Sequence, residues 1–371
     1  MKGSEIMRTL DIYENVKYLS IFNEIDVNIN KITIDTRKVC ENDCYIGIKG
    51  DKNDGNLFYM DAFNKGASLV ILENFIINDE IMDYIKNNNK SIIVVDDTKK
   101  ALGNLAKYKR SLFYSPVVAV TGSAGKTSTK DMIYSVLKEK YKTHKTVGNQ
   151  NNHIGLPLSI LSLENDNEML VLEMGMNHLG EISYLTNIAK PDIAVITNVG
   201  TAHIGNLGSR ENILKAKLEI LEGLSENGTL ILNYDDEYLR HAYNDLLLGK
   251  IPQKIIRYGI NNPDCDIIAS EIAMEDNSLR FCVKTPEGDI TVIIPCEGVH
   301  NVYNSLAAIS VGLCMGVPLF DIVAGLAEFT GVPMRQQTYS RDGLNIIEDC
   351  YNASPSSMKA GLDVLRRKNG R

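Results

Sequence analysis

The sequence predicts an α/β protein whose main sheet is mostly parallel and covered by helices on both faces. Short apolar strands recur at 117–121, 169–174, 192–200 and 229–234, and helical segments separate them. Strands that are buried on both faces have continuous apolar runs, as these four segments do. Regular alternation of strand and helix is typical of a doubly wound sheet. The helix expected after the first strand carries its apolar residues on one face, namely Met132, Ile133, Val136 and Leu137.

The alternation of strands and helices begins anew at two points along the chain, which predicts three domains. The N-terminal region, residues 1–112, has its own alternation, with strands expected at 31–38, 44–50, 68–73 and 91–97 and a helix at 57–67. The central domain is expected at 113–332. After it a new strand and helix begin, and the chain soon reaches Arg371. Because one strand and one helix cannot bury a core of their own, we expect residues 333–371 to be the truncated start of a Rossmann-like C-terminal domain.

The composition predicts a water-soluble globular protein. Of the 371 residues 44% are hydrophobic and 23% are charged, and no apolar run approaches the roughly 20 residues that span a bilayer. The net charge of −8 argues against a general nucleic-acid binder, so local positive groups must hold any anionic ligand. The first residues lack the apolar core of a signal peptide, and the 7 cysteines form no CxxC pair. Both observations favour a cytoplasmic protein with reduced thiols.

A phosphate-binding loop is predicted at TGSAGKTST, residues 121–129, between a buried strand and a helix. Its glycines let backbone N–H groups point at an anion, and the helix N-terminus adds positive charge. Lys126 is placed to reach the terminal phosphates and Thr127 to ligate Mg²⁺. The strict GxxxxGK[ST] pattern fails, because Val120 occupies the position of its first glycine. We predict that nucleotide is bound by Gly122, Ser123, Ala124, Gly125, Lys126, Thr127 and Ser128.

Two polar residues follow other buried strands. Glu173 comes near the end of the strand at 169–174, and His203 follows the strand and turn at 192–200. Ligands of doubly wound sheets bind beside the C-terminal ends of the strands, so both residues are expected next to the phosphate loop. A carboxylate suits Mg²⁺, whereas histidine is a less usual ligand for it. The simpler alternatives are a helix-capping carboxylate and a structural histidine.

A lysine is expected on the buried face of the helix at 213–221. At about 100° per residue, the apolar residues of ILKAKLEIL gather on one face. Lys217 falls near the middle of that face and Lys215 on the opposite one. The simplest explanation is an apolar stem that packs while its charge reaches water at the helix edge. The alternative is an anionic or metal-binding site directly above the helix.

These segments together resemble the Mur ligase family. The resemblance rests on the phosphate loop and on GNQNNHIGLPLSIL, LEMGMNHLGEI, NVGTAHI, AKLEIL, EGVHNVYNSLAA and EDCYNASPSSM, in the family's order. It implies an ATP-dependent ligase of peptidoglycan precursor synthesis. GNxNNxIGxP and EMGxNxxGEI resemble the member that joins D-Ala-D-Ala to UDP-MurNAc-tripeptide through an acyl phosphate. The implied enzyme is a cytoplasmic monomer without nucleic-acid or membrane partners.

The resemblance also implies a metal site. Lys126 matches the lysine that holds the β- and γ-phosphates of ATP. Two Mg²⁺ ions are implied, and their matching ligands are Thr127, Glu173, His203 and Lys217. In the family the lysine at the last position is carbamylated by CO₂, which turns a cation into an anionic oxygen ligand. Burial of Lys217 in an apolar stripe favours the neutral amine that this reaction needs.

Further matches concern the nucleotide and the substrate. Asn301 and Asn304 match residues near the adenine, Arg335 one near the γ-phosphate and Asp349 one near the ribose. Capping of a helix that begins near residue 302 is the alternative for both asparagines. UDP-sugar contacts are implied for Thr36, Arg37, Asp54, Gly55 and Asn56, and muramoyl-peptide contacts for Asn149, Asn151 and Asn152. The family usually has serine at 36 and histidine at 56, and a surface turn or polar loop is the alternative.

Other functions remain open. A sibling ligase that adds a single amino acid, or an enzyme like folylpolyglutamate synthase, would share the ATP site. A P-loop kinase would not account for Glu173, His203 and Lys217 together. A non-catalytic module that binds the substrate is the alternative from another class, because a truncated C-terminal domain would leave this chain inactive.

Overall fold

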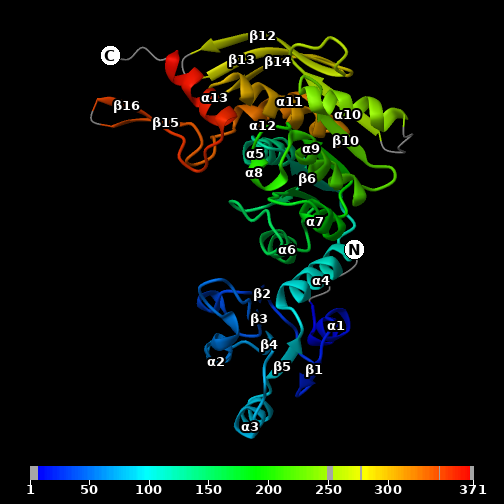
Figure 1. The fold of residues 1–371 in the computed structure, drawn as a ribbon, viewed down its shortest axis with the longest axis vertical. Coiled ribbons are helices and arrows are strands. Elements are labelled where there is room, and N and C mark those ends of the chain that lie inside the picture. The colour runs from blue at the N-terminus through cyan, green and yellow to red at the C-terminus, as the bar shows by residue number, and fades with distance from the viewer. Residues whose placement is uncertain (1–6, 249–253, 276–277, 342, 368–371) are drawn as a thin grey trace. The chain divides into compact units, whose positions relative to one another are not determined.

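The computed structural model describes residues 7–248, 254–275, 278–341 and 343–367 (Figure 1). The chain forms two compact units, one built from Met1–Tyr114 and His153–Asn165, the other from Ser115–Asn152 and Asp166–Arg371. The sequence did not predict that residues 153–165 return to the first unit. The predicted division into three domains remains a prediction.

The first unit is a small α/β sheet with strand order β1-β5-β4-β3-β2, in which all neighbours except β1 and β5 are parallel. Its strands are β1 (Ser20–Phe22), β2 (Ile32–Thr33), β3 (Cys44–Ile46), β4 (Leu69–Glu73) and β5 (Ser91–Val95). Its helices are α1 (Thr9–Asn15), α2 (Tyr59–Asn64), α3 (Asp79–Asn87), α4 (Thr98–Ser111) and α6 (Gly155–Leu161), and its 3₁₀ turns are η1 (Thr36–Lys38) and η2 (Gly55–Phe58). Helix α6 packs against α4, which accounts for the return of residues 153–165.

The strand expected at 31–38 is shorter than predicted. Strand β2 ends at Thr33, and residues 36–38 form the 3₁₀ turn η1. The cause is local, because the carboxylate of Asp35 accepts a hydrogen bond from the backbone N–H of Arg37 at 3.0 Å. Aspartate side chains that bond two residues ahead favour turns over strands.

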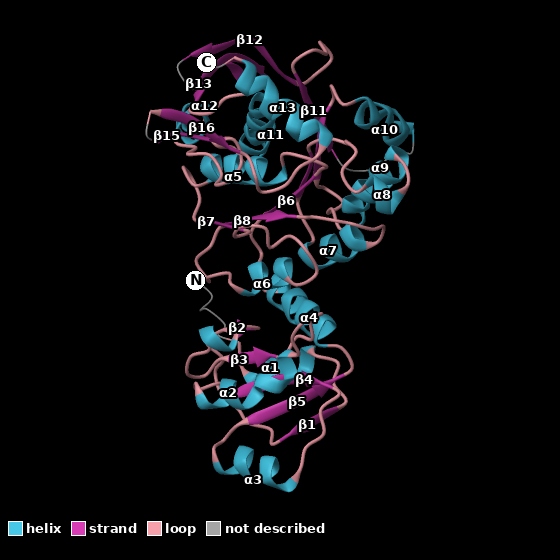
Figure 2. Ribbon diagram, turned by 60° about the vertical axis from the view of Figure 1, so that its left-hand side comes forward, coloured by secondary structure: helices cyan, strands magenta, loops and turns pink. Residues whose placement is uncertain are grey.

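The second unit contains a nine-stranded sheet with order β14-β13-β12-β11-β10-β9-β6-β8-β7. The pairings from β7 to β12 are parallel, and β12, β13 and β14 are antiparallel. The strands are β6 (Val117–Thr121), β7 (Thr143–Lys145), β8 (Met169–Glu173), β9 (Ile193–Ile196), β10 (Thr229–Asn233), β11 (Lys254–Gly259), β12 (Ile267–Glu275), β13 (Ser278–Thr285) and β14 (Gly288–Ile294). Figure 2 shows β6 and β8 side by side. The predicted α/β fold with a mainly parallel sheet is confirmed.

The antiparallel extension β12–β14 was not predicted. Burial along β13 alternates between buried and partly exposed residues, which is typical of antiparallel strands with one face on the core. The sequence SLRFCVKT carries this period of two in its apolar residues, so the signal was present.

Helices cover the sheet of the second unit. They are α5 (Lys126–Leu137), α7 (Glu181–Ala189), α8 (Ile204–Leu207), α9 (Arg210–Leu218) with the 3₁₀ turn η3 (Glu219–Glu222), α10 (Glu237–Leu248), α11 (Val299–Cys314) and α12 (Leu319–Ala327). Helices α11 and α12 both pack against α5, as Figure 1 shows. The face of α5 that was predicted to be apolar is completely buried. Packing therefore holds α5, and with it the phosphate loop, from several sides.

The last described segment is a hairpin of β15 (Gln337–Arg341) and β16 (Leu344–Glu348), followed by α13 (Pro355–Arg366). The sequence predicted β16 and α13 but not β15. Helix α13 begins with a capping box at Ser354 and a proline in its first turn, both typical start signals.

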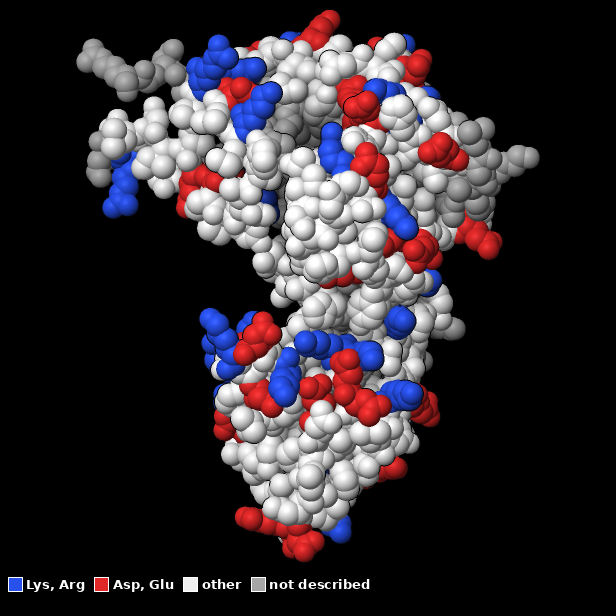
Figure 3. Space-filling view, in the orientation of Figure 1, with Lys and Arg blue, Asp and Glu red and all other residues white. Residues whose placement is uncertain are grey.

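The described part of the chain contains no helix with the length and hydropathy needed to cross a lipid bilayer. On the face drawn in Figure 3, lysine and arginine side chains are interspersed with aspartate and glutamate. This distribution agrees with the sequence argument that positive charge acts locally, at individual sites.

Candidate functional site

The phosphate loop joins β6 to α5 with the backbone that the sequence predicted. Gly125 has φ of 80°, a left-handed conformation that favours glycine. A Cβ on Gly125 would lie 2.8 Å from Oδ1 of Asn304, and a Cβ on Gly122 would lie 1.9 Å from Oγ1 of Thr197. The Lys126 ammonium donates a hydrogen bond to the Gly122 carbonyl at 3.0 Å. Burial lowers the pKa of Lys126, and the negative charge of Glu173 partly opposes this.

Two residues that the sequence analysis did not single out, Thr197 and Asn198, hold this loop. The Asn198 side chain pairs with the Ala124 peptide, accepting from its N–H at 3.0 Å and donating to its carbonyl at 3.0 Å. Thr197 Oγ1 donates to the same carbonyl at 2.7 Å, and the Ser123 N–H donates to the Asn198 carbonyl at 3.0 Å. The first N–H groups of a helix have no partner within it, so those at the start of α5 can donate hydrogen bonds to an anion.

The position of Thr197 and Asn198 in the sheet is the same kind of signal that predicted Glu173. Thr197 and Asn198 come directly after β9, at the same end of the parallel sheet as the phosphate loop. Within the segment NVGTAHI, the sequence predicted a site role for His203 but not for Asn198. Polar residues at the C-terminal ends of all neighbouring parallel strands are candidates for the ligand site.

Glu173 ends β8 and lies next to the phosphate loop, because β8 pairs with β6 in the register Val120 to Glu173. The residue is buried, with 1% of its surface exposed. Its Oε1 accepts a hydrogen bond from the Asn151 amide at 2.7 Å. Its Oε2 is buried and has no hydrogen-bond partner among the residues that the structure describes. A buried carboxylate oxygen without a partner is costly, and a cation would satisfy it.

His203 and Lys217 lie close to Lys126. Burial lowers the pKa of His203, and the positive charges of Lys126 and Lys217 lower it further. His203 has φ of 64°, which is uncommon for a residue other than glycine, at the start of α8. Among the described residues no three His, Cys, Asp or Glu side chains converge as a metal site. The predicted Mg²⁺ site would not form such a cluster, because the Thr127 hydroxyl and a carbamylated Lys217 would supply two of its four ligands.

Lys217 is buried in α9, with 1% of its surface exposed. Its charge therefore does not reach water at the helix edge, and the snorkelling explanation is wrong. Burial lowers the pKa of Lys217 well below its usual value, Lys126 adds to this, and Asp236 opposes it. Lys215, two residues earlier, is exposed as predicted.

Asn301 and Asn304 lie inside α11, and the residue that precedes this helix is Gly298. The helix-capping alternative is therefore excluded. Asn304 Oδ1 accepts from the Thr129 hydroxyl at 3.0 Å, and its amide donates to Asn301 Oδ1 at 3.0 Å. The Asn301 amide donates to the Glu297 carbonyl at 2.7 Å. Asn304 therefore ties α11 to the first turn of α5.

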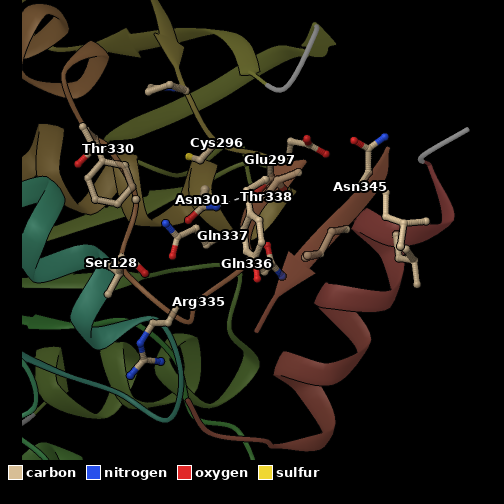
Figure 4. A pocket seen from close by; sticks show the side chains of 18 of the residues that line it. Ser128, Cys296, Glu297, Asn301, Thr330, Arg335, Gln336, Gln337, Thr338 and Asn345 are labelled. Atoms are coloured by element: carbon tan, nitrogen blue, oxygen red, sulfur yellow. Dashed lines mark hydrogen bonds between the residues drawn. The ribbon is translucent and has the colours of Figure 1, made fainter. Parts of the chain in front are cut away.

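A cavity of about 1100 Å³ opens beside Asn301. Ser128, Asn301 and Arg335 all line it, and Figure 4 shows them around the same space. The structure thus brings together residues of the phosphate loop, α11 and the segment before β15. The volume is large enough for a drug-sized or nucleotide-sized ligand.

Arg335 and Asp349 lie near one another. The Arg335 guanidinium lies over the Tyr351 ring, 4.3 Å from its centre. Burial raises the pKa of Asp349, while the Gln336 N–H and the charge of Arg335 oppose the shift. Burial also lowers the pKa of His300, beside Gln336, to about 4, so the imidazole is neutral at pH 7.

The residues predicted to contact UDP-sugar lie in the first unit and bond mainly to their neighbours. Arg37 is exposed and makes two hydrogen bonds of 2.9 Å with the Asp35 carboxylate. The Thr36 carbonyl accepts a hydrogen bond from the Lys65 ammonium at 3.1 Å. The Arg37 guanidinium is largely exposed.

The turn at residues 54–56 is built by its own side chains. Asp54 Oδ1 accepts from the backbone N–H of Asn56 at 2.9 Å and from its amide at 2.7 Å. Asn56 Oδ1 accepts from the Glu73 N–H at 2.9 Å, which ties the turn to β4. A Cβ on Gly55 would lie 2.6 Å from the Ile48 carbonyl oxygen, so only glycine fits.

The asparagines expected to bind the muramoyl-peptide lie in the second unit. The Asn151 backbone and side chain are ordered by hydrogen bonds, since its N–H donates to the Asn149 carbonyl at 2.7 Å and its carbonyl accepts from the Gly175 N–H at 2.8 Å. Asn149 and Asn152 are exposed on the same loop. Asn151 therefore orients Glu173, and its two neighbours present side chains to solvent.

Two family models match the chain: the Mur ligase middle domain over residues 120–312 and the Mur ligase family catalytic domain over residues 28–110. This chain belongs to the Mur ligase family. The chain is 41% identical over 343 residues to the UDP-N-acetylmuramoyl-tripeptide–D-alanyl-D-alanine ligase of Bacillus subtilis (strain 168), covering 92% of this chain and 71% of that protein.

Solved structures agree with this Mur ligase assignment. The UDP-N-acetylmuramoylalanyl-D-glutamyl-2,6-diaminopimelate–D-alanyl-D-alanyl ligase of Acinetobacter baumannii matches with a TM-score of 0.85 and 31% identity, over 100% of this chain and 79% of that one. The MurF ligase of Thermotoga maritima in complex with ADP matches with a TM-score of 0.78 and 32% identity, over 92% and 75% of the two chains. The predicted family and ligase class are confirmed. The comparisons do not support the expectation that truncation makes this chain inactive.

Proposed function

We propose that this Mur ligase joins D-Ala-D-Ala to UDP-MurNAc-tripeptide at the expense of ATP, in the cytoplasm and as a monomer. The observation that carries the proposal is the convergence of the phosphate loop, Glu173 and the buried Lys217 at one end of the sheet. The similarity to ligases named for the same reaction supports this choice of substrates.

In this proposal the nucleotide occupies the phosphate loop and the cavity beside it. Lys126 and the N–H groups at the start of α5 hold the β- and γ-phosphates. Asn301 and Asn304 approach the adenine, Asp349 the ribose, and Arg335 the γ-phosphate. The shared lining of the cavity by Ser128, Asn301 and Arg335 supports this placement.

Thr127, Glu173, His203 and Lys217 would hold two Mg²⁺ ions. The buried Glu173 Oε2 without a hydrogen-bond partner supports a cation at that position. When bound, Mg²⁺ offsets the negative charges of phosphates and carboxylate that the reaction brings together. Lys217 would take part as a carbamate: its neutral amine forms an N–C bond to CO₂ and releases a proton, which leaves an anion with two oxygens. Burial that disfavours the ammonium form supports this step.

The chemistry activates a carboxylate, whose oxygen is by itself a very poor leaving group. The terminal carboxylate of the tripeptide attacks the γ-phosphorus of ATP, and ADP leaves, which forms an acyl phosphate. The free amine of D-Ala-D-Ala then attacks the acyl carbon, and phosphate leaves as the amide bond forms. Lys126 and the α5 N–H groups stabilise the charge that moves onto the phosphoryl oxygens.

We further propose substrate contacts within each unit, taken separately. In the first unit Arg37 has an exposed guanidinium suited to a diphosphate, and Thr36, Asp54, Gly55 and Asn56 shape its surroundings. In the second unit Asn149 and Asn152 are exposed and suited to peptide groups, while Asn151 orients Glu173.

The decisive experiment measures phosphate release by the purified chain with ATP, Mg²⁺ and UDP-MurNAc-tripeptide. Release that requires D-Ala-D-Ala is the expected result. Release that a single amino acid supports equally well would indicate a sibling ligase. Calorimetric binding of UDP-MurNAc-tripeptide without any phosphate release would indicate a binding module and overturn the proposal.

The carbamate has its own test. Lys217→Ala should lose activity by roughly 10–100-fold, as ligands and their supporting groups do in metal sites, and a short carboxylic acid should restore part of it. Lys215→Ala, on the exposed face of α9, is the matched control and should keep full activity. Full activity of Lys217→Ala would refute a metal-binding role.

A further inference from the structure

The reaction proposed above assigns no role to the buried lysine Lys130. This residue lies on α5 one turn after Lys126, and 2% of its side chain is exposed. A buried ammonium is costly unless it is paired and hydrogen-bonded. The Lys130 ammonium donates a hydrogen bond to the Thr146 carbonyl at 2.9 Å and lies 3.3 Å from Oδ1 of Asp131.

Asp131 does not explain why a lysine is needed there. Its Oδ1 also lies 2.8 Å from the ammonium of Lys145, which is partly exposed and stacks 4.0 Å from the centre of the Tyr134 ring. Asp131 therefore keeps a cationic partner without Lys130. The contact that only Lys130 makes is the one to Thr146, across the gap between α5 and the segment after β7.

Thr146 in turn contacts Glu173. It is completely buried, and its N–H donates to the Val171 carbonyl at 2.9 Å. Its Oγ1 accepts the backbone N–H of Glu173 at 3.1 Å. The same loop contains Asn151, whose amide donates to the Glu173 carboxylate at 2.7 Å.

We propose that Lys130 is a positioning residue that holds the segment 146–151, and through it the Glu173 carboxylate, at a set distance from the phosphate-binding start of α5. The inference rests on the proposed function, because it treats Glu173 as a metal ligand. Lys126 and Thr127 come from α5, whereas Glu173 comes from β8. Groups from different elements that act on one metal–phosphate complex must be fixed to a fraction of an ångström. The Lys130 ammonium links these two elements indirectly, through its bond to the Thr146 carbonyl and the bond from the Glu173 N–H to Thr146 Oγ1.

The test compares Lys130→Met with the unchanged chain in the binding of ADP by calorimetry, with and without Mg²⁺. Methionine fills similar space but cannot donate a hydrogen bond. We expect the gain in ADP affinity that Mg²⁺ provides to fall roughly 10-fold, as for other groups that orient metal ligands. ADP affinity without Mg²⁺ should change little. The melting temperature should hold or rise, because an apolar replacement of a buried ion is often neutral or stabilising.

Lys145→Met is the matched control, because it removes the other partner of Asp131 without touching the Thr146 carbonyl. In Lys145→Met, the increase in ADP affinity that Mg²⁺ provides should equal that of the unchanged chain. Thr146→Val removes the acceptor for the Glu173 N–H and should reproduce the Lys130→Met defect. The double variant Lys130→Met/Thr146→Val should lose less than the sum of the two, since both break one connection.

If Mg²⁺ increases the ADP affinity of Lys130→Met as much as that of the unchanged chain, Lys130 is a purely structural residue and the inference is refuted. If Lys130→Met does not fold, Thr146→Val tests the same connection. An undiminished increase in ADP affinity from Mg²⁺ in that variant would refute the inference. A different result separates the two proposals: if the unchanged chain gains no ADP affinity from Mg²⁺, the proposed function fails before Lys130 is tested.

Discussion

Around the phosphate loop, polar side chains bond to partners that are far away in the sequence, whereas the carboxylates of Asp35 and Asp54 in the first unit bond within their own turns. Ala124 pairs with Asn198, 74 residues later, and Thr129 with Asn304, 175 residues later. In the first unit Arg37 pairs with Asp35, and Asn56 with Asp54, each two residues apart. Both regions were predicted to bind ligand groups, yet they are built in different ways.

The difference separates two uses of polar residues. Bonds between neighbours build a turn whether or not a ligand is near, so Asp54 and Asn56 are accounted for by the turn itself. Bonds between distant elements hold groups that must act together, and they leave selected atoms without a protein partner, such as Glu173 Oε2. Variants that break the distant pairs should therefore change activity first, whereas variants of Asp54 and Asn56 should change stability first.

The largest effect is expected for Lys126→Met. Loss of a charge aimed at the transferring phosphoryl group should lower kcat by roughly 10²–10³-fold. The melting temperature should change little, because within the described part of the chain the ammonium donates a hydrogen bond to the Gly122 carbonyl alone. Phosphate-release kinetics and thermal unfolding measure the two effects. A large fall in stability with activity preserved would place Lys126 among structural residues.

Asn198→Ala should have a smaller effect on the same loop. It removes two hydrogen bonds to the Ala124 peptide, each contributing about 1 kcal/mol. Part of that loss should appear as an increase of roughly 10-fold in the KM for ATP, with kcat less affected, because the loop is no longer held ready for the phosphates. Steady-state kinetics at varied ATP test this. An unchanged KM would show that α5 alone orders the loop.

Asn56→Ala should act on stability instead. The buried amide bridges Asp54 and the Glu73 N–H, and leaving such partners unsatisfied costs about 1–3 kcal/mol. Denaturant unfolding followed in the first unit should show that loss. The KM for UDP-MurNAc-tripeptide should stay within about twofold once the protein is folded. A large increase in that KM without loss of stability would show that the Asn56 side chain contacts the substrate directly.

The smallest effect concerns Arg37→Gln and acid stability. The hydrogen bond from Arg37 holds the pKa of Asp35 at about 2, below its usual 3.8. A carboxylate whose pKa is lower in the folded state stabilises the fold above its unfolded pKa, and the stabilisation is lost as pH falls from about 4 to 2. Arg37→Gln should lower the melting temperature at pH 6 by no more than about 2 °C, because the pair is exposed. At pH 2 the two proteins should melt alike, and a difference that persists there would contradict this cause.

Several features of the site were predictable because they depend on strand order and local pattern. Glu173 and His203 follow buried strands of a parallel sheet, and Lys217 has a helical position that the surrounding leucines and isoleucines define. The structure buries Glu173 and Lys217 and brings His203 close to Lys126. The roles assigned to these residues remain predictions.

Other features depended on partners that the pattern does not specify. Nothing near Asn198 in the sequence indicates that its amide meets Ala124, and nothing near Lys130 indicates Thr146. The return of residues 153–165 to the first unit and the antiparallel strands after β12 were missed for a similar reason. Each depends on which surface a segment packs against, and an apolar segment suits many surfaces.

By itself the sequence determined the α/β fold, the phosphate loop, the family and the residues at the ends of the central strands, because these follow from periodicity and from short motifs. The tertiary structure decided whether the polar side chains at those positions are satisfied. It showed that Asp54 and Asn56 satisfy each other, that the Lys217 ammonium cannot reach water, and that Glu173 keeps one buried oxygen without a partner. The physical reason is that the cost of burying a polar group depends on the atoms around it, which only the folded chain brings together.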